Sequence, residues 1–360
     1  MAASPPASPP ISSVPKAALY LFSHSIWSSV VRLALEEKGY GHDEIDQKFV
    51  DLLKGENFLP TYLRINPKGT VPTLVVPFEK TLSADVESRF KALTDSISIV
   101  QFLDKSRTVI SRTHTTSAAP APALAPATIA FSAVSKRIIE LLHADDVSSY
   151  VLTFETAKDE ASLKVLAKVL LPMLRARRET LDSLLSEAEK GTVHASEKTK
   201  LFWLEKKVQD GPILSVFEDA EKAESELDTE GKEKRRAYFE KAKKLWEVDL
   251  KELLVVVSKE MIGPFVLGDQ ISIADLHLAA YLTRVISLAG GAASDVGNVA
   301  VSKLEAQVGV KFPKDFKGGE TQRPGGAEVA QAGPQSKLAA FWDAVKERPS
   351  WKKVYAEGLP

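Results

Sequence analysis

A proline- and alanine-rich stretch, SAAPAPALAPAT at residues 117–128, separates two parts of the sequence with different hydrophobic patterns. Before it, short apolar runs typical of strands alternate with segments whose apolar residues recur at helical spacing. After it, almost the whole chain has a helical pattern. We therefore expect an α/β domain at residues 17–106, a linker at 107–128 and a larger all-helical domain at 129–360.

The pattern of the first part predicts the order strand, helix, strand, helix, strand, strand, helix. The strands are expected at residues 17–22, 45–50, 71–76 and 90–94. The helices are expected between a serine-rich stretch and Gly39, within residues 57–69, and at residues 95–105. This alternation is typical of a compact α/β unit.

The most regular pattern of the second part is RRAYFEKAKKLWEVDLKELLVVV, at residues 235–257. Its apolar residues recur every three or four positions, which predicts one long amphipathic helix. The charged segment 218–236 is either a solvated helix or a connector. Residues 289–336, rich in Gly and Pro, predict a long surface loop, and residues 336–358 predict one closing helix with a partly ordered tail.

The composition excludes several classes of function. The chain has no cysteine, so disulfides, thiolate metal sites and any mechanism that uses a protein thiol are excluded. Its six histidines are scattered without ligand spacing, and its net charge of −1 does not favour nucleic acid or an anionic membrane, so we expect no metal and neither of those partners. Residues 1–16 predict a disordered Pro/Ser tail without signal-peptide features, and no apolar run reaches the roughly 20 residues of a membrane span. We expect a cytoplasmic protein.

Four serines and a histidine stand between two apolar runs in YLFSHSIWSSVVRL, at residues 20–33. These serines either begin a helix or supply a hydroxyl for chemistry. A Ser–His hydrolase is one interpretation of FSHS, but the sequence has no G-x-S-x-G elbow. Adjacent residues of an extended strand also face opposite ways, so we reject that interpretation.

Two motifs in the first part have the pattern of a binding site. In NPKGTVPTLVV, residues 66–76, Gly69 allows a tight turn and Pro72 begins a strand, with the Val71–Pro72 bond either cis or trans. In LTDSISIVQFL, residues 93–103, Asp95 and Ser96 precede a helical pattern. They form either a plain helix N-cap or a site where helix N–H groups bind a carboxylate and the Asp carboxylate binds an amine.

A third motif, GDQISIADLHLAAYL at residues 268–282, is structural. Ser272 and Asp275 stand three positions apart before an apolar run, which is a capping box with Asp in place of Glu. Ile271 is placed to form the hydrophobic staple of the same helix.

Together these motifs resemble the glutathione transferase family. NPKGTVPTL is similar to that family's loop and strand around its cis-proline, TDSISIVQFLD to its acidic-Ser motif, SIADL to its buried capping box and KLAAFWDAVKERPSWKKVY to its closing helix. The resemblance covers residues 17–106 and 129–355 with gaps and points to a serine-type, fungal-like member. It implies a thioredoxin-like N-terminal domain, an all-helical C-terminal domain, a glutathione site on the first domain and a homodimer.

The sequence departs from the family's pattern in its insertions and in its long linker. The insertions lie at residues 77–89, 180–235 and 290–335. Each could line, cover or block the pocket for the second substrate. The resemblance therefore does not predict the class of that substrate.

The resemblance implies that Ser25 stabilises the thiolate of glutathione. Ser25 lies about two turns before Arg32, where the loop meets the helix, which is the place of the active hydroxyl in serine-type members. Tyr20 lies one residue out of register with the phenol of tyrosine-type members. Four neighbours remain alternative or supporting groups: Ser23, His24, Ser28 and Ser29. Of these, Ser28 and Ser29 are favoured as residues of the helix start.

The rest of the glutathione site is implied in the same way. The resemblance assigns the Val71 backbone and Pro72 to the cysteinyl segment of glutathione, and Asp95 and Ser96 to its γ-glutamyl end. A basic group should meet the glycyl carboxylate, and the candidates are Lys54 and Lys68.

We therefore expect a glutathione transferase with a role in detoxification. It would activate the thiol of its co-substrate glutathione for conjugation to, or reductive cleavage of, a hydrophobic electrophile. The lack of cysteine argues against the thiol-transferase and dehydroascorbate-reductase branch. The alternative is a non-catalytic protein of the same fold that binds hydrophobic ligands or a protein partner, which the charged segment 218–260 modestly supports.

Overall fold

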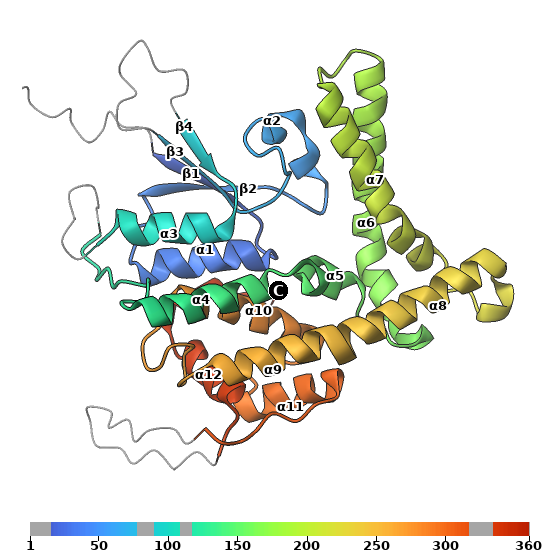
Figure 1. Cartoon of the computed structure of the whole chain (residues 1–360). Coiled ribbons are helices and arrows are strands. Elements are labelled where there is room, and N and C mark those ends of the chain that lie inside the picture. Colours follow the sequence, from blue (N-terminus) through green and yellow to red (C-terminus); the bar gives the residue numbers. More distant parts are fainter. Residues whose placement is uncertain (1–15, 78–89, 109–116, 317–333, 360) are drawn as a thin grey trace, which may run out of the picture.

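The N-terminal part is built on one four-stranded sheet. A computed structural model describes residues 16–77, 90–108, 117–316 and 334–359 (Figure 1). The strand order is β2-β1-β3-β4, with β1 parallel to β2 and antiparallel to β3, and with β3 antiparallel to β4. This mixed sheet confirms the expected thioredoxin-like fold. The strands are β1 (Ala17–Leu21), β2 (Ile45–Phe49), β3 (Thr73–Pro77) and β4 (Phe90–Leu93).

The helices of this part follow the predicted order. They are α1 (Ile26–Glu37), the short pair η2 (Glu56–Phe58) and α2 (Pro60–Leu63), and α3 (Ser96–Ser106). α1 stops where expected because Gly39 adopts a φ of 65°, in the left-handed region that ends helices. β3 starts two residues later than predicted, since Pro72 has no N–H to donate to a strand ladder.

Some predictions fall on other parts of the chain. The predicted tail 1–16 and the insertion 77–89 lie outside the described residues, except for Lys16 and Pro77. The same holds for residues 109–116 of the linker and 317–333 of the third insertion. The domain division at 107–128 stays a prediction.

The described end of the linker is tied to the N-terminal domain by buried charges. The Lys38 side chain, 1% exposed, donates to the Asp104 carboxylate at 2.9 Å and to the Pro122 carbonyl at 2.7 Å. Asp104 also accepts from the backbone N–H groups of Leu124 and Ala125 at 2.9 and 3.1 Å. Because a buried ion pair needs its remaining hydrogen bonds satisfied, this stretch of linker is held in one conformation.

After the linker, most of the described residues are in helices. In Figure 1, α6 and α7 form a long hairpin beside α2, and α8 and α9 run as one rod across the helical part. Within the described ranges, no helix is both long enough and apolar enough to cross a bilayer. The elements are α4 (Ile129–Leu142), η3 (Asp145–Val147), α5 (Ser149–Phe154), α6 (Glu160–Glu189), α7 (Glu197–Glu218), η4 (Glu224–Glu226), α8 (Thr229–Lys244), η5 (Leu245–Asp249), α9 (Leu250–Glu260), α10 (Ile273–Leu288), α11 (Gly297–Val308), α12 (Lys337–Lys346) and α13 (Pro349–Val354).

Three predictions for this part need correction. The surface loop predicted at 289–336 contains α11, whose apolar stripe is buried, and its regular spacing was masked by the glycines and prolines on either side. The single closing helix is two, because Pro349 starts α13 at a position where proline is favoured. The long helix at 235–257 contains the π-helical turn η5, in which adjacent Leu245 and Trp246 are both buried.

The two parts share one hydrophobic core, and α10 lies at its centre. α10 is buried on nearly all sides, and it packs against α1 of the N-terminal domain and α4 of the helical part. Its start confirms the predicted capping box. The Asp275 carboxylate accepts from the Ser272 backbone N–H at 2.7 Å, from the Ser272 hydroxyl at 2.6 Å and from the Val266 N–H at 2.6 Å. Burial raises the pKa of Asp275 to about 6, although these hydrogen bonds lower it.

Replacing Asp275 should destabilise the whole protein. In Asp275→Ala two buried backbone N–H groups lose their acceptor, and each costs about 1–3 kcal/mol, so we expect a loss of about 2–6 kcal/mol in the free energy of unfolding. Asp269→Ala, which removes an exposed carboxylate from the same segment, should change it by less than about 0.5 kcal/mol. Urea unfolding followed by tryptophan fluorescence measures both, and equal losses would contradict the structural role of the box.

Candidate functional site

The register of the sheet brings three of the sequence motifs to one edge. Tyr20 near the end of β1 pairs with Thr73 at the start of β3, and Leu74 pairs with Leu93 at the end of β4. The segments that follow β1, precede β3 and follow β4 therefore leave the sheet on the same side. They carry Ser23 to Ser25, Val71 and Pro72, and Asp95 and Ser96.

Ser25 is the N-cap of α1. Its hydroxyl oxygen accepts a hydrogen bond from the Ser28 N–H at 3.3 Å, and its carbonyl accepts from the Ser29 hydroxyl at 3.3 Å. Ser28 and Ser29 are buried, and the Ser28 hydroxyl accepts from the Phe22 N–H at 3.3 Å. The capping role given to Ser28 by the sequence therefore belongs to Ser25, while Ser28 and Ser29 lie inside the helix start.

The neighbours of Ser25 on the loop face elsewhere. The ring of His24 is exposed, and its Nδ1 lies 3.2 Å from the hydroxyl of Ser23. Tyr20 packs edge-on against Tyr62, with ring centroids 5.8 Å apart, on the sheet itself. Among the serines of this stretch, Ser25 alone combines partial exposure with the first position of a helix.

The other two segments present backbone and hydroxyl groups. The Val71–Pro72 bond is cis, as the proline motif allowed. Asp95 caps α3 by accepting from the Ser98 N–H at 2.8 Å, so the carboxylate is exposed at the helix start. Ser96 is 3% exposed, and its hydroxyl has no hydrogen-bond partner among the described residues. A buried hydroxyl without a partner at a helix N-terminus is a group that a ligand can satisfy.

The two candidate lysines are surface residues. The Lys54 ammonium is 77% exposed and lies 3.3 Å from the Asp51 carboxylate, and Lys68 is also exposed. Neither is held by a buried partner. Lys54 lies between β2 and η2, and Lys68 lies between α2 and β3.

The α6–α7 hairpin packs against the loop between β2 and α2. The Thr180 hydroxyl donates to the Lys54 carbonyl at 2.8 Å, and the Trp203 indole donates to the Phe58 carbonyl at 2.9 Å. Phe58 and Trp203 are buried in one apolar cluster, and the Arg177 guanidinium lies 5.1 Å from the Phe58 ring centroid. The insertion at 180–235 thus holds a loop of the N-terminal domain in place. Figure 1 shows the hairpin beside α2.

Two histidines of the helical part lie against the start of α1. The ring of His143, at the end of α4, stacks on Trp27 with centroids 3.7 Å apart and an interplanar angle of 16°. His143 Nε2 lies 3.0 Å from Nδ1 of the fully buried His277 on α10. His277 Nε2 has no partner among the described residues. Because an orphaned buried N–H is rarer than an orphaned acceptor, we assign the proton of His277 to Nδ1, which donates to His143.

Both histidines are held neutral. Burial lowers the pKa of His143 to about 4, against the opposing effect of the Asp95 charge. Burial, and to a lesser extent the neighbouring His143, lowers the pKa of His277 well below its usual value.

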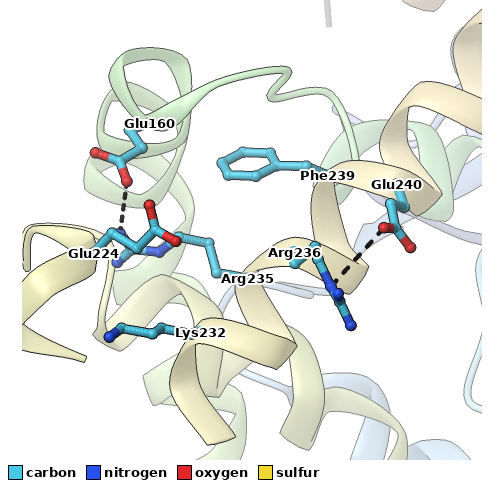
Figure 2. Close-up of a pocket in the computed structure, with 7 residues that line it drawn as sticks. All are labelled: Glu160, Glu224, Lys232, Arg235, Arg236, Phe239 and Glu240. Carbon is cyan, nitrogen blue, oxygen red and sulfur yellow. Dashed lines mark hydrogen bonds and ion pairs between the residues drawn. The ribbon is translucent and has the colours of Figure 1, made fainter. Parts of the chain in front are cut away.

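The pocket in Figure 2 lies elsewhere, between the start of α6, η4 and α8. Figure 2 shows Arg235 facing Glu160 and Arg236 facing Glu240. The buried Arg235 also donates to the Lys222 carbonyl at 2.9 Å. Three acidic and three basic side chains line this pocket, so it has no excess of either charge. The lining residues are Glu160, Glu224, Lys232, Arg235, Arg236, Phe239 and Glu240.

Comparison with known proteins identifies the N-terminal part. Residues 24–106 match the family model of the glutathione S-transferase N-terminal domain. This part of the chain is therefore similar in sequence to that domain. This agrees with the mixed sheet and with the three motifs at its edge.

Individual relatives match over the same part. A zeta-class glutathione S-transferase of Euphorbia esula is 38% identical over 91 residues, 25% of this chain and 34% of the relative. A tetrachloro-p-hydroquinone reductive dehalogenase of Sphingobium chlorophenolicum is 47% identical over 64 residues, 18% of this chain and 25% of the relative. The chain thus spans about a third or less of these curated relatives. Among solved structures, a β-etherase of Sphingobium sp. strain SYK-6 is 17% identical and covers 95% of this chain and 100% of its own, with a TM-score of 0.47.

Three residues near Ser25 escaped the sequence analysis: His143, His277 and Arg284. The histidines stand 134 positions apart, so no local spacing connects them. Arg284 had a visible signal, because it is the only charged side chain in the apolar run LHLAAYLTRVISL. A charge inside a helix that is apolar on every face needs a partner beyond its own helix.

The histidine pair should make stability depend on pH. The unfolded pKa of about 6.5 exceeds the folded pKa of His143, about 4, so the unfolded chain binds more protons between these values. Stability is therefore full above about pH 6.5 and falls as the pH drops toward 4. After discounting for partial exposure we expect His143 to account for about 2 kcal/mol of that fall.

His143→Phe keeps an aromatic ring on Trp27 and removes the titrating group. Its free energy of unfolding should fall less steeply than that of the wild type between pH 6.5 and 4, even if it starts lower. His194→Gln, at an exposed histidine before α7, should leave the slope unchanged. Denaturant unfolding at a series of pH values gives the slopes, and a slope in His143→Phe equal to that of the wild type would refute the assignment.

Proposed function

We propose that this protein is a glutathione transferase that activates the glutathione thiol through the hydroxyl of Ser25. The observation that carries the proposal is the position of Ser25 as N-cap of α1, at the sheet edge shared with Val71–Pro72 and Asp95–Ser96. The activated sulfur would attack a hydrophobic electrophile or take part in its reductive cleavage. The names of the relatives support both forms, since they include a transferase and a reductive dehalogenase.

The hydroxyl of Ser25 has the right hydrogen-bond capacity for this role. It uses an acceptor lone pair for the Ser28 N–H, so its own O–H hydrogen can turn toward a thiolate. Lowering the pKa of a thiol by two units from about 8.5 requires the thiolate to be stabilised by about 2.7 kcal/mol. A hydrogen bond to a charged group contributes about 1.5–3 kcal/mol and a helix N-terminus about 0.3–1 kcal/mol. One serine at the start of α1 is therefore sufficient in magnitude.

The remaining groups of the edge suit the ends of glutathione. The start of α3 and the unpartnered Ser96 hydroxyl would receive the γ-glutamyl carboxylate, and the exposed Asp95 carboxylate would receive the amine. The backbone at Val71 and Pro72 would hold the cysteinyl segment. Lys54 and Lys68 are proposed for the glycyl carboxylate, with weaker support because both are solvated.

In conjugation the bond-making step is a displacement at the electrophile. The sulfur lone pair forms the new sulfur–carbon bond, and the leaving group departs with the electron pair of the bond that breaks. Ser25 holds the negative charge of the sulfur until that bond forms. The serine-type mechanism belongs to this proposal, while the fungal-like subtype, the homodimer and the role in detoxification stay predictions.

Ser25→Ala should separate activation from binding. We expect the pKa of the bound thiol to rise by about 1–2 units and the rate of conjugation to chloro-dinitrobenzene at pH 6.5 to fall about 10–100-fold, since each pKa unit is worth about 1.4 kcal/mol. Glutathione affinity should change little. Absorbance of the thiolate near 240 nm across pH gives the pKa, and assays at saturating glutathione give the rate.

Matched variants guard against a loss of folding. Ser25→Ala also loses a helix cap, which costs about 0.5–2 kcal/mol, so unfolding curves accompany the assay. Ser25→Thr keeps hydroxyl and cap and should retain most of the activity, while Ser23→Ala should be neutral. Retention on a glutathione column without turnover in the wild type would favour a non-catalytic binding protein, and no retention would defeat both the site and the mechanism.

A further inference from the structure

Arg284 reaches from the core helix α10 to the peptide that precedes Ser25. Its neighbours Thr283 and Val285 are fully buried, and Arg284 itself is only partly exposed. One nitrogen, Nη2, donates to the carbonyl of His24, and Nη1 lies 3.4 Å from the hydroxyl of Thr153 on α5. The His24 carbonyl belongs to the peptide bond that joins His24 to Ser25. The guanidinium therefore contacts the backbone directly next to the residue that carries the proposed active hydroxyl.

The positive charge of Arg284 is not compensated by the protein around it. A guanidinium carries five N–H donors, and the two bonds to His24 and Thr153 use two of them. Its Nε is buried without a partner, and among the described residues it forms no ion pair with a carboxylate. Arg348 gives the contrast at the other end of α1, where it forms two bonds of 2.6 and 2.5 Å to the Glu37 carboxylate.

The titratable groups around Arg284 do not supply the missing negative charge. Tyr355, after α13, faces it, and burial raises the pKa of this phenol to about 12, although the nearby Ser29 and Thr283 side chains and the charges of Arg284 and Arg32 oppose that rise. The phenol is therefore neutral at physiological pH. Arg32 on α1 adds a second positive charge, and the exposed imidazole of His24 adds no negative one. An anion at this place would meet a desolvated cation without a competitor.

We propose that Arg284 is the counter-charge for the anionic sulfur of glutathione beside Ser25. This inference rests on the proposed function and deepens it. Ser25 donates the hydrogen bond and the start of α1 provides its dipole, while α10 of the helical part provides a full positive charge. When the sulfur lone pair forms the sulfur–carbon bond, the sulfur becomes neutral and this attraction ends. Arg284 thus favours the thiolate over the S-substituted product and assists product release.

The sulfur charge can be tested with two ligands of nearly equal shape. Glutathione sulfonate carries a permanent negative charge at the sulfur position, and S-methylglutathione carries none. In Arg284→Met, calorimetry should show at least tenfold weaker binding of the sulfonate and less than twofold change for the S-methyl compound. Arg284→Lys, which keeps a charge, should recover part of the sulfonate affinity. The pKa of the bound glutathione thiol should rise by about one unit or more in Arg284→Met.

Control variants separate charge from packing. Arg284→Gln keeps a donor for the His24 carbonyl without the charge and should behave like Arg284→Met toward the sulfonate, even if Arg284→Met folds poorly. Arg348→Met breaks the ion pair at the far end of α1 and should lower the melting temperature without changing the ratio of the two affinities.

The outcomes distinguish the two proposals. If the wild type binds neither ligand, the proposed function fails and the inference fails with it. If the wild type binds both and the Arg284 variants weaken both equally, or neither, Arg284 only ties α10 to the loop and the inference alone is overturned. A loss confined to the sulfonate supports it.

Discussion

Helix α10 determines how the two parts of this protein meet. It is buried on nearly every face, so each polar group that it carries must find a partner or cost stability. Its first turn is satisfied by Asp275, and the Thr283 hydroxyl bonds back to the Ala279 carbonyl at 2.7 Å. Of its other polar side chains, His277 contacts His143 and the Trp27 ring of α1, and Arg284 donates to the His24 carbonyl just before α1. The interface between the parts is therefore fixed where the candidate site lies.

The site consequently depends on both parts of the chain. The sheet edge provides Ser25, Val71–Pro72 and the start of α3, and the helical part covers the same region with His143 and Arg284. The α6–α7 hairpin restrains the loop before α2 through backbone carbonyls at Lys54 and Phe58. These bonds to carbonyls depend on the backbone position of the loop, and the packing of Phe58 against Trp203 adds a contact that depends on the side chain.

Local patterns predicted what depends on local physics. The strands, the capping box and the start of α3 at Asp95 follow from hydrophobic period and cap residues, and the structure confirms them. α11 was missed because flanking glycine and proline outweighed a short buried stripe. The stack of Trp27 on His143 was beyond sequence reasoning, because contacts between residues over a hundred positions apart leave no spacing to read. The assignment of Ser25 to chemistry came from family resemblance and stays a proposal.

A single serine can be both cap and thiolate partner because a hydroxyl accepts and donates at once. The cap needs an acceptor for the Ser28 N–H, and a thiolate needs a donor. Asp or Asn caps a helix as well as Ser does, but a carboxylate has no hydrogen to donate and would repel the thiolate. Alanine could do neither. The combination of a helix start and an anionic ligand thus restricts this position to a residue with a hydroxyl. The full positive charge has to come from another element. That element is α10, whose Arg284 reaches the peptide before Ser25.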